Sequence, residues 1–422
     1  MKRGLFVTVA SLLLFLPSPV GAQTQTYGIG GVAFGLLNNV SPYNNAIFTG
    51  TTILSEDSTS GNFRGRVDIA GSIYSRGNLR IGSKIHIVNN YQSGYNPLGP
   101  GDILYDIIAQ ETDLDTRIQV KNGDFVIESI ATQVGEAGEN NAVEGVYVDG
   151  FNNAYSVGTH YVENWSNEVP DIPFPNILDG LYEVFGHLGE DFEACIASKS
   201  GANDIAIAAS IYADWATGTG CLSGSSSRGD VANYDIIVDR HTPTAWLVGP
   251  DTYGNGMHYT SSSGQRGMGR LTIQGTVVID GDFTFGDETL TGLYYEAMGA
   301  NTGSGSDAAE GATLVVNGSF NASGQFYPEN GYLKGTLYPA VNDINSLGIV
   351  VMGDINFNGS RGDVFTGFFY SPWQTNFNRP TNFAGTIITG LMNFIMAPNI
   401  YQVPNLEYYL PPGIPGGRSI IK

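Results

Sequence analysis

Residues 65–82 read Gly65-Arg-Val-Asp-Ile-Ala-Gly71-Ser-Ile-Tyr-Ser-Arg-Gly77-Asn-Leu-Arg-Ile-Gly82 and contain the pattern from which we predict the fold. Apolar and polar residues alternate between glycines, so each segment predicts a short strand with one buried face. A glycine at each end allows a sharp turn or a close approach between two backbones. A single strand of this kind cannot bury its apolar face alone, whereas a stack of such strands can.

The same pattern returns in the second half of the chain. Copies of it run over residues 275–286, 314–324, 349–359 and 383–390. A β-sandwich built of hairpins would instead show longer strands joined by two-residue Asn-Gly or Asp-Gly loops. The repeats therefore predict a mainly β protein, a parallel β-solenoid (β-helix) with a small helical insertion, and the sandwich is the alternative.

The middle of the chain interrupts this pattern. The prolines of Val169-Pro-Asp-Ile-Pro-Phe-Pro175 favour an extended path. Apolar residues between 176 and 199 recur at helical spacing, and the Ala- and Ile-rich residues 203–217 predict a second helix. The expected organisation is a signal peptide (1–22), an N-terminal part of the solenoid (23–168), a Pro-rich connector with a helical insertion and flexible loops (169–268), a C-terminal part of the solenoid (269–410) and a Pro/Gly-rich tail (411–422).

The first 22 residues predict an export signal. A positive Met1-Lys-Arg start precedes an apolar stretch, and small residues then precede a cleavage site between Ala22 and Gln23. The apolar stretch of about 12 residues is too short to span the hydrocarbon core of a bilayer as a helix. We therefore expect an exported protein, at the cell surface, outside the cell or in the periplasm, with no transmembrane segment after signal removal.

Composition limits the classes of function. Charged residues make up 14% of the chain and apolar residues 42%, a balance that argues against disorder. The formal net charge of −21 opposes broad binding to nucleic acid phosphates and suits a soluble extracellular surface. The one dense group of basic residues, between Arg64 and Lys84, is interpreted as a solvated strand face.

The chain has two cysteines, Cys195 and Cys221, and in an exported protein such a pair predicts a disulfide. The bridge would close a loop of about 26 residues and stabilise the fold by roughly 3 kcal/mol on the chain-entropy account. It would join the end of the first predicted helix to a point beyond the second. A two-thiolate metal site is the alternative.

Catalytic motifs are not evident in the sequence, so we expect neither catalytic nor cofactor-binding residues, and the metal content stays open. Clustered carboxylates are still considered because some parallel β-helices cleave acidic polysaccharides. The candidates are Asp280 with Asp282, and Asp235 with Asp239, Arg240 and His241. Aspartate is favoured at turns for backbone reasons, and isolated Asp turns could bind Ca²⁺ weakly.

Several stretches together resemble a known family. They are residues 168–175, 275–286, 347–359, 383–390 and 401–406. The set is similar to the extracellular β-helical domain of PilX-type minor pilins and related pilus-associated surface proteins of Deinococcus–Thermus-like bacteria. The resemblance implies a role at the cell surface or pilus in adhesion, assembly or uptake, and it brings no catalytic residues with it.

The leading hypothesis is a secreted or cell-surface structural or adhesive β-solenoid protein, for which the resemblance implies association with a pilus. Its expected partners are surface or pilus proteins or glycans, and nucleic acid is not expected. One alternative is a polysaccharide-processing β-helix enzyme. Another is a module that binds DNA or a pilus tip, which would use the basic residues between Arg64 and Lys84.

Overall fold

The structure is a computed structural model in which the chain is described over most of its length after residue 40. The described residues are 41–55, 66–82, 84–88, 116–128, 130–137, 142–150, 158–185, 190–199, 203–217, 219–222, 231–232, 234–251, 254–261, 267–287, 290–299, 311–328, 346–403, 410–411 and 413–415. The predicted cleavage site at Ala22 and Gln23 lies outside them.

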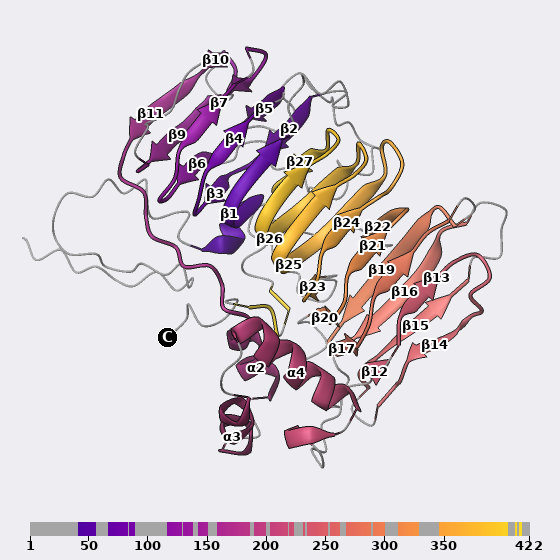
Figure 1. Cartoon of the computed structure of the whole chain (residues 1–422). Coiled ribbons are helices and arrows are strands. Elements are labelled where there is room, and N and C mark those ends of the chain that lie inside the picture. Colours follow the sequence, from indigo (N-terminus) through magenta and orange to yellow (C-terminus); the bar gives the residue numbers. More distant parts are fainter. Residues whose placement is uncertain are drawn as a thin grey trace, which may run out of the picture.

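The described part of the chain is mainly β, and most strands pair in parallel with the strand three places further along the sequence (Figure 1). Three successive strands thus make one coil of the chain, and equivalent strands of successive coils form three parallel stacks. Parallel pairing of this kind differs from the hairpins of a sandwich.

The first stack contains β12 (Val231–Ala232), β17 (Thr276–Ile279), β20 (Ala312–Val316), β23 (Leu347–Val351), β3 (Ile73–Ser75), β6 (Arg117–Val120), β9 (Val143–Val148) and β11 (Val162–Ser166). The second contains β13 (Ile236–Val238), β18 (Phe283–Phe285), β21 (Phe320–Ala322), β24 (Ile355–Phe357), β4 (Leu79–Ile81) and β7 (Phe125–Ile127).

The third stack contains β14 (Ala245–Val248), β15 (Gly256–Thr260), β16 (Gly269–Gln274), β19 (Gly292–Met298), β22 (Gln325–Pro328), β27 (Asn399–Tyr401), β2 (Val67–Ala70), β5 (Ile85–Val88), β8 (Gln133–Val134) and β10 (Thr159–His160). In this stack β14, β15 and β16 pair antiparallel, whereas the other pairs are parallel. Longer strands take part in more than one stack: β25 (Val364–Phe377), β26 (Asn382–Phe394) and β1 (Ile47–Ser55).

The order of the coils in space differs from their order in the sequence. Strand β1 pairs with β26 on one side and with β3 and β4 on the other, and β2 lies between β27 and β5. The coils of residues 47–166 therefore continue the stacks that residues 231–403 begin (Figure 1). We call this junction, between β1–β2 and β26–β27, the seam.

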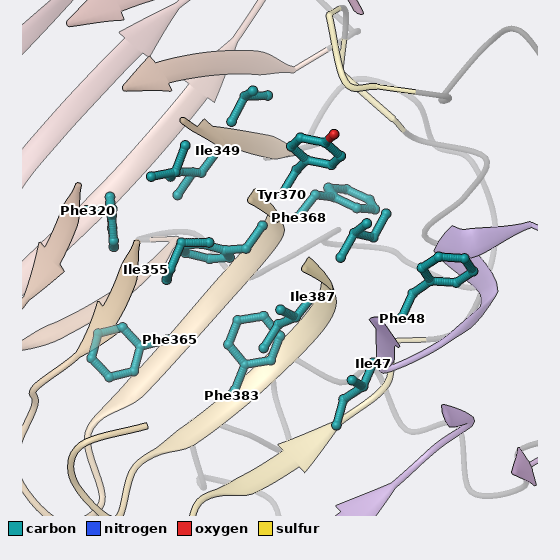
Figure 2. Close-up of a cluster of buried hydrophobic side chains, with 14 of the residues drawn as sticks. Ile47, Phe48, Phe320, Ile349, Ile355, Phe365, Phe368, Tyr370, Phe383 and Ile387 are labelled. Atoms are coloured by element: carbon teal, nitrogen blue, oxygen red, sulfur yellow. The ribbon is translucent and has the colours of Figure 1, made fainter. Parts of the chain in front are cut away.

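Apolar side chains fill the interior across the seam. Ile47 lies in register with Ile387, and both are fully buried. Figure 2 shows these two side chains beside Phe383, in a cluster that draws on strands from both halves of the chain. Phe48 extends the cluster by stacking on Tyr74, with ring centroids 4.8 Å apart. The seam is thus part of the main core.

A proline-rich connector, residues 167–176, leaves the last N-terminal coil and runs along the first stack. Lys121 donates a hydrogen bond from Nζ to the carbonyl oxygen of Val169 at 3.0 Å. The hydroxyl of Tyr74 donates to the carbonyl oxygen of Pro170 at 2.7 Å and accepts from the backbone N–H of Ile172 at 3.0 Å. These contacts bind the connector to the N-terminal side of the seam.

The same connector also binds the C-terminal side of the seam. The ring of Phe174 lies 6.2 Å from that of Phe48 and 5.7 Å from that of Tyr370. The buried hydroxyl of Tyr370, on β25, donates to the carbonyl oxygen of Pro175 at 2.9 Å. A substituent on Gly50 would contact the Phe174 ring at 3.0 Å, so the connector lies close against β1. The connector therefore bridges the two halves of the core.

Helices follow the connector, as the spacing of apolar residues predicts. They are α2 (Ile177–Phe185), α3 (Glu190–Ser198) and α4 (Asp204–Thr217). Helix α4 lies against β12 and β17 at one end of the first stack (Figure 1). Parallel pairing of the C-terminal coils begins at Val231, ahead of residue 269, since β12 and β13 pair with β17 and β18.

We expect Tyr74→Phe to lower the free energy of unfolding by about 1–3 kcal/mol, because it leaves a carbonyl and an N–H of the connector without their hydroxyl partner. Urea unfolding at neutral pH measures the change. Tyr161→Phe is the matched control, because Tyr161 is 39% exposed. Equal stability of the two variants would contradict a clamping role for Tyr74.

The connector contacts also predict a dependence on pH. Burial raises the pKa of Tyr74 to about 12, above the value of about 10 for an exposed tyrosine. The contribution of the neutral phenol is complete below about pH 10 and is lost as the pH rises through about 12. We expect the unfolding free energy of Tyr74→Phe to fall less steeply across this window than that of the wild type, by up to about 1.4 kcal/mol per pH unit. If urea unfolding shows the same pH dependence of the unfolding free energy for Tyr74→Phe and the wild type, this expectation is wrong.

Candidate binding face

The predicted cysteine pair is joined in the structure. Cys195 at the end of α3 and Cys221 in a short 3-10 turn (Gly220–Leu222) form a disulfide, with their Cα atoms 5.3 Å apart. The bridge ties the segment after α4 back to α3. Beside it, Lys199 forms a salt bridge with Asp214 of α4. These links join α3 to α4, and Phe185 of α2 packs on Phe192 of α3 and Tyr212 of α4, so the three helices form a unit at one side of the strand stacks.

The first pair of candidate carboxylates does not converge on one site. Asp280 accepts a hydrogen bond from Nδ2 of Asn317 at 3.1 Å, and Asp282 accepts from the backbone N–H of Ser319 at 2.7 Å. Both partners lie on the next coil. The side chain of Asp235, in turn, accepts from the backbone N–H of Asp282 at 2.9 Å. These aspartates connect successive coils at their turns.

The second group of candidates forms a local turn. The carboxylate of Asp239 accepts hydrogen bonds from the backbone N–H groups of His241 and Thr242, at 2.8 and 3.0 Å. Nε of Arg240 donates to Nε2 of His241 at 2.9 Å. This is the backbone role expected of an aspartate at a turn. Among the described residues, no group of three or more His, Cys, Asp or Glu is arranged to hold a metal ion.

Basic residues of the predicted strand face are paired with acidic ones. Arg76 lies 3.3 Å from Asp171 of the connector, and Arg80 lies 3.5 Å from Glu128. Arg66 likewise lies 3.1 Å from its partner, Asp68, and Arg64 lies outside the described residues. These ion pairs offset the positive charge that phosphate binding would need. In the described part of the chain no helix has the length and apolar character needed to cross a bilayer.

A face rich in aromatic and polar side chains, which the sequence interpretation missed, lies on the third stack at the end remote from the seam. On β16, Leu271 and Ile273 are buried in the core, so the alternate residues point outward. Burial alternates in the same way on β15 and β19, and strand register places Trp246 of β14 and Tyr327 of β22 on the same face. The outward residues are Trp246 on β14, His258 and Thr260 on β15, Arg270 and Thr272 on β16, Tyr294 and Glu296 on β19, and Tyr327 on β22, and we call them the aromatic face.

Strand register places these residues in two rows. In one row Trp246 is opposite His258, which is opposite Thr272, and Thr272 is level with Glu296. In the other row Thr260, Arg270, Tyr294 and Tyr327 follow one another across the strands. The strands carrying the two rows lie side by side in Figure 1. Adjacent strands are about 4.8 Å apart, so the five strands give a face about 19 Å long.

Ring contacts fix the orientation of the aromatic side chains. The Trp246 and His258 rings meet edge to face at 5.1 Å, and those of Tyr294 and Tyr327 do so at 5.0 Å. Trp246 remains 43% exposed, whereas Tyr327 is 8% exposed. Burial raises the pKa of Tyr327, so its hydroxyl stays protonated near neutral pH. The face therefore combines held rings with hydroxyl, carboxylate and cationic groups.

No family model matches the chain, and no curated protein matches it. The structure is similar to that of the competence-associated pilin ComZ from Thermus thermophilus, with 16% identity and a TM-score of 0.48, over 90% of this chain and 73% of that one. That protein is described as a pilin and not as PilX-type. A likeness at this level carries no functional conclusion.

The disulfide generates a prediction for the helical unit. We expect Cys195→Ala combined with Cys221→Ala to destabilise this unit by roughly 3 kcal/mol, because the loop between the two residues is then no longer constrained by a disulfide in the unfolded chain. Hydrogen exchange should rise in α3 and α4 while the strands of the seam stay protected. Equal loss of protection in β1 and β26 would show that the bridge supports the whole molecule instead.

Proposed function

We propose that this chain is an exported β-solenoid protein of the cell surface that acts by binding, as a structural or adhesive component associated with a pilus. The aromatic face carries the proposal, because it presents the exposed ring of Trp246 and the half-buried ring of Tyr294, each packed on a neighbouring ring, on a broad sheet. Exposed aromatic groups beside polar ones are typical of interaction surfaces. The disulfide supports an oxidising location outside the cytoplasm.

The proposed solenoid is a single continuous coil stack assembled from both halves of the chain. Its support is the parallel register of the first two stacks, and of the third stack from β16 onward, which continues across the seam. Such stacks give a long, stiff body in which each coil contacts its neighbours. A stiff body that displays a binding face suits a protein that holds surface components at a distance from the cell.

The polysaccharide-processing alternative receives less support from the geometry. General acid–base catalysis on a glycoside needs two carboxyl groups facing one bond. Asp280 and Asp282 instead accept hydrogen bonds from the neighbouring coil. The DNA-binding alternative is weakened by the ion pairs of Arg66, Arg76 and Arg80.

Fractionation of the native host tests the proposal. We expect the mature protein on the outer surface, accessible to added protease and recovered with pilus or envelope proteins after mild cross-linking. Protein found wholly in the cytoplasm would contradict the proposal. Acidic polysaccharide cleavage by the purified protein, lost in Asp280→Asn, would favour the enzyme instead.

A further inference from the structure

We propose that the aromatic face binds a neutral glycan chain laid across strands β14, β15, β16, β19 and β22. The inference rests on the proposed binding function and names the ligand class of that surface. Its basis is the combination of ring geometry, polar groups and charge on adjacent strands.

The rings supply flat apolar surface at low entropic cost. Trp246 is 43% exposed and its ring is held by His258, so little side-chain freedom remains to be lost on binding. Tyr294 is held in the same way by Tyr327. Pyranose rings have faces made of C–H groups, which pack on aromatic rings while the sugar hydroxyls stay at the edge. Held rings on a sheet therefore suit a sugar chain.

The polar groups of the face suit hydroxyls, which both donate and accept hydrogen bonds. Thr260 and Thr272 carry hydroxyls that can donate and accept, the Glu296 carboxylate accepts, and all three residues lie within two rows of the same sheet. A face about 19 Å long, set by the strand spacing, has room for several sugar units. The polar groups thus match a polyhydroxyl chain along its length.

Charge selects a neutral chain over an acidic one. The face holds one carboxylate, that of Glu296, and one guanidinium, that of Arg270, whereas the whole chain carries a formal net charge of −21. An acidic polymer would meet this overall negative potential. A neutral glycan avoids it and depends on ring packing and short-range hydrogen bonds, which salt screens little.

Affinity electrophoresis of the folded mature protein tests the inference. The probes are three soluble neutral polysaccharides (a β-1,3-glucan, a xyloglucan and a galactomannan) and two acidic ones (alginate and polygalacturonate). We expect retardation by at least one neutral polymer, and little change when salt is raised. Trp246→Ala should weaken that binding at least tenfold, and Trp246→Phe should keep part of it.

Trp373→Ala is the matched control, because Trp373 is 54% exposed but lies on β25, outside the aromatic face. Circular dichroism checks that each variant is folded. Binding of acidic polymers alone, retardation by no polymer, or equal losses in Trp246→Ala and Trp373→Ala would each overturn the inference. Fractionation measures the surface location of the protein independently of glycan binding. A negative result in affinity electrophoresis therefore leaves the proposed function intact.

Discussion

The structure depends on the parallel pairing of β1 with β26, two strands from opposite ends of the described chain. Ile47 and Ile387 are fully buried partners at this junction, although 340 positions separate them in the sequence. Bringing such distant segments together has a loop-closure cost, but that cost grows only slowly with loop length. Continuous burial of the core across three stacks offsets it. Without the seam, each half would expose an apolar end.

The connector makes this arrangement possible. The chain finishes its N-terminal coils at one end of the stack and must reach the other end before it can wind back to the seam. Prolines favour the extended path that this crossing needs. Hydrogen bonds from Tyr74 and Tyr370 fix the path on both sides of the seam. The segment that separates the halves in sequence therefore also holds them together in space.

The sequence predicts single elements better than their order in space. The glycine-bounded repeat of residues 65–82 predicts β2, β3 and β4, and the apolar spacing of residues 203–217 predicts α4. Every coil has a similar alternation, however, so no local signal shows that β1 follows β26. Strand β12 is missed because it is only two residues long and follows the Ser- and Gly-rich residues 223–229. The aromatic face is missed because its residues come from five strands and meet only through register.

The C-terminal coils carry a row of hydrogen bonds between side chains of successive strands. In the C-terminal coils an asparagine ladder joins neighbouring strands: Asn356 donates to Asn321, Asn376 to Asn356 and Asn393 to Asn376, at 3.0, 3.0 and 3.3 Å. The next position in register beyond Asn393 is occupied by Leu54, so the row of asparagines ends there. The ladder therefore stops at the seam. Asn321 also donates to the Thr284 hydroxyl at 3.4 Å, so the ladder includes β18 and β21, which share coils with β19 and β22 of the aromatic face. These hydrogen bonds add to the backbone pairing beneath that part of the face, and a rigid support of this kind keeps binding groups in place.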